Sequence, residues 1–154
     1  MKEYKSLVIV LLVAFLILAV SYTFSTGKVH APVVEQSPTA PLRFEIVRTP
    51  EAQTQGLSGR RDVPSGYGML FVFPEKKAYS FWMKDMLVPI DILWLEDDGT
   101  ILGIEDSVTP ASYPETVFTA PAQVGLVLEL RAGEARARGL FVGGHVELPK
   151  NWRN

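Results

Sequence analysis

The sequence predicts a mainly β domain, a compact sandwich or barrel of about seven short strands with one or two short helices, preceded by an N-terminal membrane or signal helix. Short runs rich in β-branched and aromatic residues recur at close spacing between glycines and prolines. No regular alternation of strands with long helices accompanies them, so we expect no parallel sheet. With 47% hydrophobic and 21% charged residues, the 154-residue chain is also too apolar to be disordered.

Residues 1–27 predict a membrane-targeting segment. Lys2 and Lys5 precede an unbroken apolar run from Leu7 to Val20, and a milder stretch continues to Phe24. A helix over the apolar run spans roughly 21 Å, which suits a cleaved signal peptide, whereas extension to Phe24 gives about 27 Å and suits a transmembrane anchor. Under either interpretation the rest of the chain is exported. The domain is either anchored to the membrane on the outside of the cytoplasm or, if the leader is cleaved, secreted or periplasmic.

The exported part divides into three segments. Residues 28–41 contain Pro32, Pro38 and Pro41 without any periodic apolar face, so they predict a linker. Residues 42–148 are long enough for a single hydrophobic core and predict one β domain. Residues 149–154 form a short tail.

The domain is predicted to begin with a strand and a short helix. Residues 43–48 alternate apolar and polar side chains, which indicates a strand. Thr49, Pro50 and Glu51 then supply a hydroxyl cap, a proline at the first helical position and an acid at the positive end of the helix dipole. Gly56 ends this helix after two turns at most.

The remaining strands follow from β-branched and aromatic runs. We expect them at residues 68–73, 78–83, 88–96, 100–104, 124–131 and 146–148. Asp98-Gly99 predicts a tight hairpin turn between the third and fourth of these runs. Three prolines within residues 107–121 predict a long surface loop, and residues 133–138 predict one or two helical turns that end at Gly139.

The charge balance gives no sign of nucleic-acid binding. The chain carries 15 Lys and Arg against 17 Asp and Glu; removing residues 1–27 takes away Lys2, Lys5 and Glu3 and leaves 13 basic and 16 acidic side chains. A net charge of −3 lacks the basic patch that binds a phosphate backbone. We therefore expect no nucleic-acid partner.

Common catalytic and metal-binding motifs are also absent from the sequence. It has no Gly-x-Ser-x-Gly elbow, no glycine-rich phosphate loop and no cysteine. His145 is the only histidine of the domain, and it follows two glycines at a predicted turn, so an exposed turn residue is favoured over a general base. The sequence therefore indicates no zinc site, and we expect no cofactor or metal.

Two acidic residues lie inside apolar strands, where a carboxylate needs a partner. Asp91 interrupts residues 87–95, and Glu129 interrupts residues 126–130. If both face one cavity, repulsion between their charges would raise one pKa and create an acid/base pair. The alternative is that each is a buried ion pair or a backbone-capping carboxylate. Candidate cationic partners are Arg60, Arg61, Lys84 and Arg131.

The segment from Phe81 to Met86 combines aromatic, thioether and charged side chains. Trp82 beside Lys84 suggests a ligand-binding surface on which a ring stacks while the charge orients the ligand. Met83 and Met86 would offer soft ligands to copper(I), but two methionines fit core packing better.

These residues resemble those of a known family, the domain of unknown function 192. The matching motifs, in order, are Gly56-Leu57-x-x-Arg60, Gly68-Met69-Leu70-Phe71-x-Phe73, Phe81-Trp82-Met83-Lys84 with Pro89-Ile90-Asp91, and Leu128-Glu129-Leu130-x-x-Gly133 with Gly139. They cover about Phe44 to Val146. The resemblance implies a compact, mainly β domain, often exported, with no established activity. Arg60, Lys84, Asp91 and Glu129 are its polar members.

Members of that family commonly carry other residues at a few of these positions. Methionine is common where Ser58 stands, Asn-Thr where Asp85-Met86 stand, and aspartate where His145 stands. The copper interpretation and a catalytic role for His145 are both weakened by these differences.

The sequence as a whole favours a ligand-binding or interaction module of the cell envelope. Its expected partners are the membrane, through the N-terminal helix, and a small molecule or envelope component. The candidate site consists of Arg60, Trp82, Lys84, Asp91 and Glu129. One alternative is a hydrolase of envelope glycans with Asp91 and Glu129 as its acid/base pair, which requires carboxyl groups about 5 Å or 6.5–9.5 Å apart. Another is a purely structural or protein-interaction domain.

Overall fold

The computed structural model describes residues 40–154, which form a mainly β domain with seven strands and two short α-helices. The predicted membrane or signal segment, residues 1–27, and residues 28–39 of the predicted linker lie outside the described residues. No helix between residues 40 and 154 is long and apolar enough to cross a membrane.

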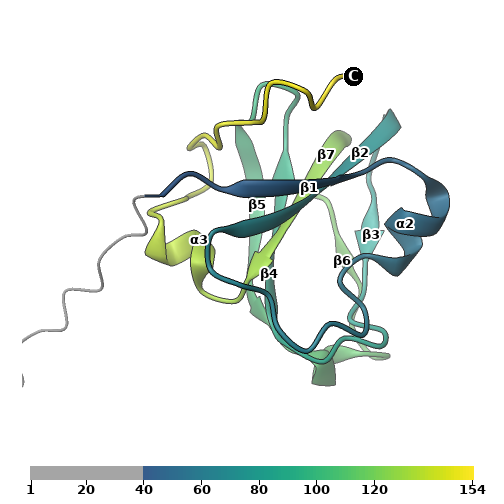
Figure 1. Cartoon of the computed structure of the whole chain (residues 1–154). Helices are drawn as coiled ribbons and strands as arrows, with labels where there is room; N and C mark the ends of the chain where they lie inside the picture. The colour runs from purple at the N-terminus through teal and green to yellow at the C-terminus, as the bar shows by residue number, and fades with distance from the viewer. Residues whose placement is uncertain (1–39) are drawn as a thin grey trace, which may run out of the picture. The chain divides into compact units, whose positions relative to one another are not determined.

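Five strands form one twisted sheet, and two short strands pair separately (Figure 1). The order across the large sheet is β1 (Arg43–Val47), β2 (Tyr67–Lys77), β7 (Val124–Arg131), β4 (Ile90–Leu95) and β5 (Ile101–Val108). The small sheet pairs β3 (Ser80–Phe81) with β6 (Phe118–Thr119). Because β1 and β5 remain at the two edges, the described strands do not close into a barrel.

One strand pair contradicts the expectation that no strands run parallel. β1 and β2 are parallel neighbours, while the other pairs of the large sheet are antiparallel, so the sheet is mixed. A parallel pair needs a crossover of about a dozen residues or more. Residues 48–66 provide it, and they contain α2 (Pro50–Gln55). A helix of six residues was too short to suggest this crossover from the sequence.

The helix and hairpin signals are confirmed. Thr49 caps α2, since its Oγ1 accepts a hydrogen bond of 3.3 Å from the Ala52 amide. At the β4–β5 turn, Asp98 Oδ1 accepts from the Thr100 amide at 2.8 Å. Gly99 has φ +96°, and a Cβ there would lie 2.2 Å from the Val146 carbonyl oxygen, so only glycine fits.

Other predicted boundaries differ from the structure. β5 continues to Val108, and the predicted loop of residues 107–121 contains a 3₁₀ turn at Pro110–Ser112 as well as β6. The predicted strand at residues 146–148 does not form; the residue before it, His145, makes one isolated bridge with Thr100. The ends of these strands depend on which backbone segments pair, and local β propensity does not show that pairing.

The large sheet buries two different faces. The aromatic face carries Met69, Phe71, Ile92, Trp94 and Val127. The leucine face carries Leu70, Leu93, Leu95, Leu126, Leu128 and Leu130. α2 packs on the aromatic face through Ala52, and α3 (Glu134–Ala137) packs on the leucine face through Ala135. Figure 1 shows the two helices on opposite sides of the sheet. Because both faces of the sheet are covered, β4 is buried along its whole length.

Candidate functional site

Glu129 lies in the middle of the large sheet. Its strand, β7, is flanked by β2 and β4, and Glu129 pairs with Met69 on one side and Ile92 on the other. Because side chains at paired positions point to the same face, the Glu129 carboxyl joins the aromatic face. The residue is 5% exposed.

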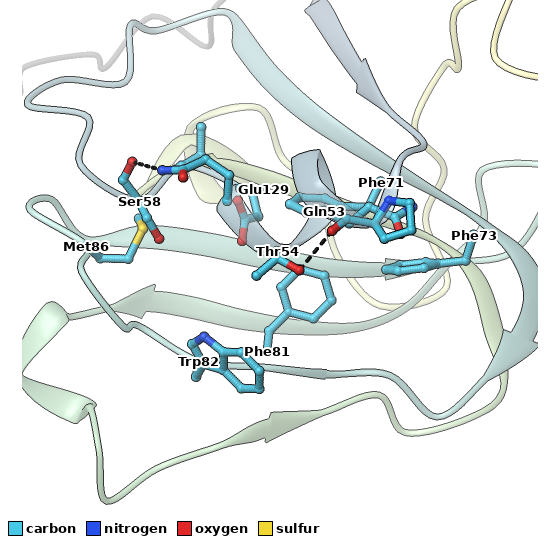
Figure 2. Close-up of a pocket in the computed structure, with 13 residues that line it drawn as sticks. Gln53, Thr54, Ser58, Phe71, Phe73, Phe81, Trp82, Met86 and Glu129 are labelled. Atoms are coloured by element: carbon cyan, nitrogen blue, oxygen red, sulfur yellow. Dashed lines mark hydrogen bonds between the residues drawn. The ribbon is translucent and has the colours of Figure 1, made fainter.

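A cavity of about 270 Å³ opens above Glu129 between α2, the aromatic face and the segment that follows β3. Figure 2 shows the carboxyl between Ser58 and Met86 on one side and the phenylalanine rings on the other. The lining residues are Pro50, Gln53, Thr54, Gln55, Gly56, Leu57, Ser58, Phe71, Phe73, Phe81, Trp82, Met86 and Glu129. The wall is mostly apolar with a single carboxyl at its centre, which is the usual composition of a small-molecule site.

The end of α2 keeps the carboxyl within reach of the cavity. Gly56 ends the helix with φ +50°, a conformation that favours glycine. A Cβ at this position would lie 3.4 Å from Phe71 Cζ and 3.7 Å from Glu129 Oε2. A side chain at position 56 would therefore stand between the carboxyl and the helix end, and glycine leaves that space open.

Aromatic rings brace the wall of the cavity against one another. Phe81 contacts Phe71 edge to face, with ring centroids 5.0 Å apart, and contacts Trp94 in the same way at 5.4 Å. Phe73 stacks on Tyr79. Such pairs fix ring orientation beyond what apolar burial alone provides, so we expect the cavity to be largely preformed.

The Glu129 carboxyl is buried with one oxygen atom that no hydrogen bond satisfies. Its Oε2 lacks a partner within the part of the chain that the structure describes. Burial raises the pKa of Glu129 to about 8, and the positive charge of Arg60 opposes this rise. The group is therefore largely protonated at neutral pH, and a buried, unpartnered carboxyl of this kind in a cavity marks a candidate functional site.

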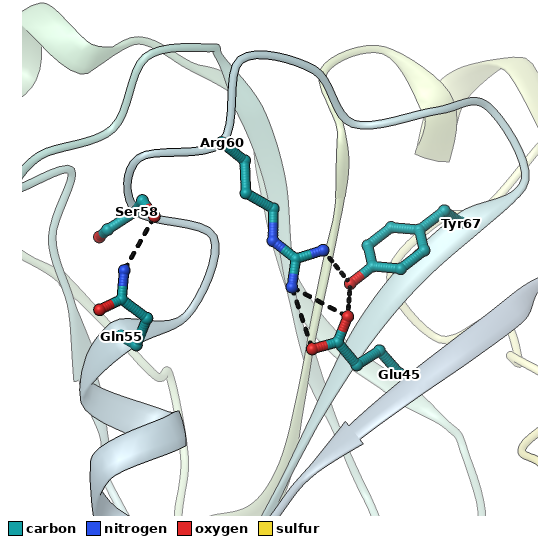
Figure 3. Close-up of polar contacts among 5 residues, drawn as sticks. All are labelled: Glu45, Gln55, Ser58, Arg60 and Tyr67. Carbon is teal, nitrogen blue, oxygen red and sulfur yellow. Dashed lines mark hydrogen bonds and ion pairs between the residues drawn. The ribbon is translucent and has the colours of Figure 1, made fainter.

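Arg60 does not line the cavity but belongs to a neighbouring polar cluster (Figure 3). Its guanidinium donates to both carboxylate oxygens of Glu45, at 3.0 and 2.9 Å, and to the Tyr67 hydroxyl at 2.8 Å. The Tyr67 hydroxyl in turn donates to Glu45, and this bond, more than the arginine, holds the pKa of Glu45 below its usual value. Arg60 acts on Glu129 through its charge and not through contact.

Asp91 lies on the other side of the sheet. It pairs with Leu130 and so joins the leucine face, where it is fully buried. Three backbone amides donate to its carboxylate: Ser107 at 2.8 Å, Gly133 at 3.0 Å and Ala135 at 2.9 Å. Burial raises the pKa of Asp91, and these three amides oppose the rise. Asp91 therefore ties β5 and the start of α3 to β4.

The separation of Asp91 from Glu129 corrects the hypothesis of an acid/base pair. The sheet itself lies between the two carboxyl groups, so they share no cavity and cannot flank one glycosidic bond. Alternation along each strand is visible in the sequence, but the register between β4 and β7 is not. The backbone-capping alternative describes Asp91, whereas Glu129 has neither a cap nor a direct cationic partner among residues 40–154.

Trp82 and Lys84 lie at the mouth of the cavity. Trp82 is 50% exposed and lines both the cavity and an adjoining open hollow of about 560 Å³. Lys84 lines that hollow together with Asp85. The loop after α2 is tied to this segment, because the Ser58 hydroxyl donates to the Lys84 carbonyl and the Gly59 amide donates to the Asp85 carbonyl. Trp82 and Glu129 are thus brought together, with Lys84 beside them.

Sequence reasoning missed the phenylalanine wall and the contribution of α2. Phe71 and Phe73 are two residues apart in one strand, which places both rings on one face. The missing information was which face Glu129 shares. No group of three or more His, Cys, Asp or Glu side chains within residues 40–154 is arranged to hold a metal ion. Met83 and Met86 are buried in the core of the aromatic face.

A comparison with protein-family models decides the relationship suggested by the motifs. The model of DUF192, described as uncharacterized ACR, matches residues 33–148. The chain belongs to the DUF192 family. No curated protein matches it.

Two solved structures resemble this DUF192 chain. One is a protein of Sinorhizobium meliloti provisionally described as a transcription regulator; it is 35% identical, with a TM-score of 0.65 over 69% of this chain and 81% of the other. The second is a protein of unknown function from Novosphingobium aromaticivorans; it is 31% identical, with a TM-score of 0.64 over 70% of this chain and 75% of the other. At this identity and coverage they share the fold of the DUF192 domain.

Proposed function

We propose that this DUF192 protein is a ligand-binding domain of the cell envelope that takes a small ligand into the cavity above Glu129. The observation that carries the proposal is the buried Glu129 carboxyl, whose Oε2 has no partner among the described residues, in a cavity lined by Phe71, Phe73, Phe81 and Trp82. An unpartnered buried carboxyl costs stability. A ligand that hydrogen bonds to it would recover that cost, whereas a purely structural core would gain by replacing it with an apolar side chain.

The location outside the cytoplasm is proposed from the N-terminal sequence. Lys2 and Lys5 before the apolar run to Val20 favour export of everything that follows. Mass spectrometry of the protein recovered from cell membranes would test this. A full-length chain in the membrane fraction indicates an anchor, and a chain shortened by about 27 residues outside the cytoplasm indicates a cleaved signal. A full-length chain confined to the cytosol would contradict the proposal.

The proposal includes no nucleic-acid partner. The description of the Sinorhizobium meliloti protein as a regulator applies to that protein. In this chain acidic side chains outnumber basic ones, 17 to 15. Such a balance does not support binding to a phosphate backbone.

Thermal-shift screening of the full-length chain in detergent tests the binding function. A ligand that binds the folded state raises the melting temperature in proportion to the logarithm of its concentration above Kd. We would screen envelope sugars, short peptides, metal ions and small amines, and repeat each hit with Glu129→Gln and Trp82→Ala. Binding in the cavity predicts that both substitutions reduce the shift.

A matched variant separates the cavity from general charge effects. Glu147→Gln removes the same charge from an exposed residue next to Val146, which is buried in the leucine-face core. Glu147→Gln should leave the shift in melting temperature caused by each compound unchanged. The proposal is wrong if no compound stabilises the protein, or if hits stabilise Glu129→Gln and Trp82→Ala as strongly as the unsubstituted protein.

A further inference from the structure

The hydroxyl groups in the cavity wall have already used their hydrogens. Thr54 donates its hydroxyl hydrogen to the Pro50 carbonyl at 2.8 Å, and Ser58 donates to the Lys84 carbonyl at 2.9 Å. A hydroxyl has one hydrogen, so these oxygens can only accept from a ligand. Figure 2 shows Thr54 beside the Phe81 ring and Ser58 beside Met86, on the other side of Glu129.

The two glutamines of the wall are oriented in a similar way. Gln53 donates from Nε2 to the Val72 carbonyl at 2.8 Å, and Gln55 donates from Nε2 to the Ser58 carbonyl at 2.9 Å (Figure 3). Each amide commits one of its two N–H donors to the protein and keeps the other N–H and its carbonyl oxygen, so it can donate or accept. The Thr54 and Ser58 hydroxyls are therefore the wall groups that favour a ligand that donates hydrogen bonds.

The ionisable group in the cavity wall is an acid. Glu129 is the only ionisable side chain among the residues described as lining the cavity. Of the nearby cations, Arg60 is held by Glu45 and Tyr67, and Lys84 lines only the adjoining hollow, so neither belongs to the cavity wall. An anionic ligand would find no cation on the wall, whereas a cationic ligand would meet the carboxyl.

The rings around the carboxyl suit a positive charge as well. Phe71, Phe73, Phe81 and Trp82 surround the cavity. The faces of aromatic rings are electron-rich and attract ammonium groups, most strongly where water is excluded. A volume of about 270 Å³ lies just below the range of roughly 300–1,000 Å³ that holds drug-sized molecules, so the ligand is small.

From these observations we propose that the ligand is a small organic cation whose N–H-bearing ammonium group is bound by Glu129, with its carbon atoms against the phenylalanine and tryptophan rings. This assignment rests on the proposed function, because it names the class of ligand for the same cavity. On binding, the neutral carboxyl releases its proton to the solvent and accepts a charge-assisted hydrogen bond from the ammonium group.

A matched set of three probes tests the charge of the ligand. Benzylamine, benzyl alcohol and benzoate share a ring and differ in charge, and each is titrated at pH 8 into the full-length chain in detergent by NMR. We expect benzylamine to bind about ten-fold more tightly than benzyl alcohol, and benzoate to bind most weakly of the three. Comparison between variants removes the contribution of partition into micelles.

Glu129→Gln keeps the size and polarity of the side chain and removes its charge. We expect it to weaken benzylamine about ten-fold and to change benzyl alcohol by less than about two-fold. Glu147→Gln should change neither, and thermal unfolding of each variant shows that it remains folded.

The possible results separate the two proposals. If benzyl alcohol binds as tightly as benzylamine and Trp82→Ala weakens both, the binding function stands and the cationic ligand is wrong. An unchanged benzylamine affinity in Glu129→Gln also overturns the cationic ligand. If none of the three probes binds and the wider screen gives no hit, both proposals fail.

Discussion

Asp91 of β4 and Glu129 of β7 lie on adjacent strands, one register position apart, but their buried carboxyl groups are on opposite faces of one sheet. Asp91 faces the leucine face and accepts three backbone hydrogen bonds of 2.8 to 3.0 Å. Glu129, paired with the next residue of β4, belongs to the aromatic face, and its Oε2 accepts no hydrogen bond from the residues that the structure describes. The difference shows that burial of an acid does not by itself indicate a functional site; the informative feature is whether the fold satisfies it.

The surroundings of each carboxyl follow the same contrast. Asp91 is enclosed where the Ser107, Gly133 and Ala135 amides converge, so it joins three segments of the chain. Glu129 lies under a cavity with Gly56 leaving space beside it. Asp91 completes the fold, while Glu129 is the residue that we propose binds a ligand.

The largest effect expected from this contrast is the loss of stability when Asp91 is substituted. Asp91→Ala leaves three buried amide donors without an acceptor, and we expect the free energy of unfolding to fall by about 3–5 kcal/mol. Urea denaturation followed by circular dichroism measures it. Asp91→Asn, which keeps one acceptor oxygen, should lose less. A loss below about 1 kcal/mol for Asp91→Ala would show that the amides find other partners and that Asp91 is no different from Glu129.

Glu129→Gln should change the free energy of unfolding in the opposite direction, towards greater stability. Because the folded-state pKa of about 8 lies above the unfolded value of 4.5, ionisation of Glu129 favours unfolding. Its contribution to stability is complete below pH 4.5 and is lost as pH rises through 8. We therefore expect Glu129→Gln to be more stable than the unsubstituted protein by roughly 2–4 kcal/mol at pH 9, with the difference shrinking towards pH 4.5.

Chemical denaturation at several pH values measures this difference. Glu147→Gln, the exposed counterpart, should show no comparable pH-dependent gain. If Glu129→Gln is equally destabilising from pH 5 to pH 9, then Glu129 is satisfied in the folded protein and the contrast with Asp91 disappears.

Much of the fold could be predicted because it depends on local signals. The Thr49 cap, the Asp98-Gly99 turn and the strand at residues 124–131 need only neighbouring residues, and all three are confirmed. The parallel pairing of β1 with β2 depends on contacts between distant segments. Propensity carries no information on which strands become neighbours.

The site was predicted in part for the same reason. Both acids were recognisable, because a carboxylate in an apolar strand is unusual. The hypothesis that both face one cavity is wrong, while the backbone-capping alternative describes Asp91, because a shift of one residue in register moves a side chain to the other face. Trp82 and Glu129 are brought to one cavity. The phenylalanine wall comes from β2 and β3, and nothing in the sequence indicates that the rings of these strands lie around Glu129.

A smaller effect is expected at the mouth of the cavity. Trp82→Ala removes one ring from the wall while costing little core packing, since the side chain is 50% exposed. We expect benzylamine affinity to fall about five-fold and stability to change by less than about 1 kcal/mol. Leu87→Ala is the matched variant, because Leu87 is 56% exposed, belongs to the same segment and does not line the cavity. Equal losses of affinity in the two variants would contradict a role for the ring.

The smallest expected effect concerns the charge that opposes the high pKa of Glu129. The groups nearest to it are Arg60, which favours the ionised form, and its partners Glu45 and Tyr67. Arg60→Gln removes the positive charge and leaves Glu45 unneutralised, so the pKa of Glu129 should rise further, by roughly half a pH unit. Carbon-detected NMR of the Glu129 carboxyl measures this pKa. Arg61→Gln, an exposed neighbour, is the control. A lowered or unchanged pKa in Arg60→Gln would mean that the cluster does not act on Glu129, and that the difference between the two carboxyls arises from desolvation and hydrogen bonding alone.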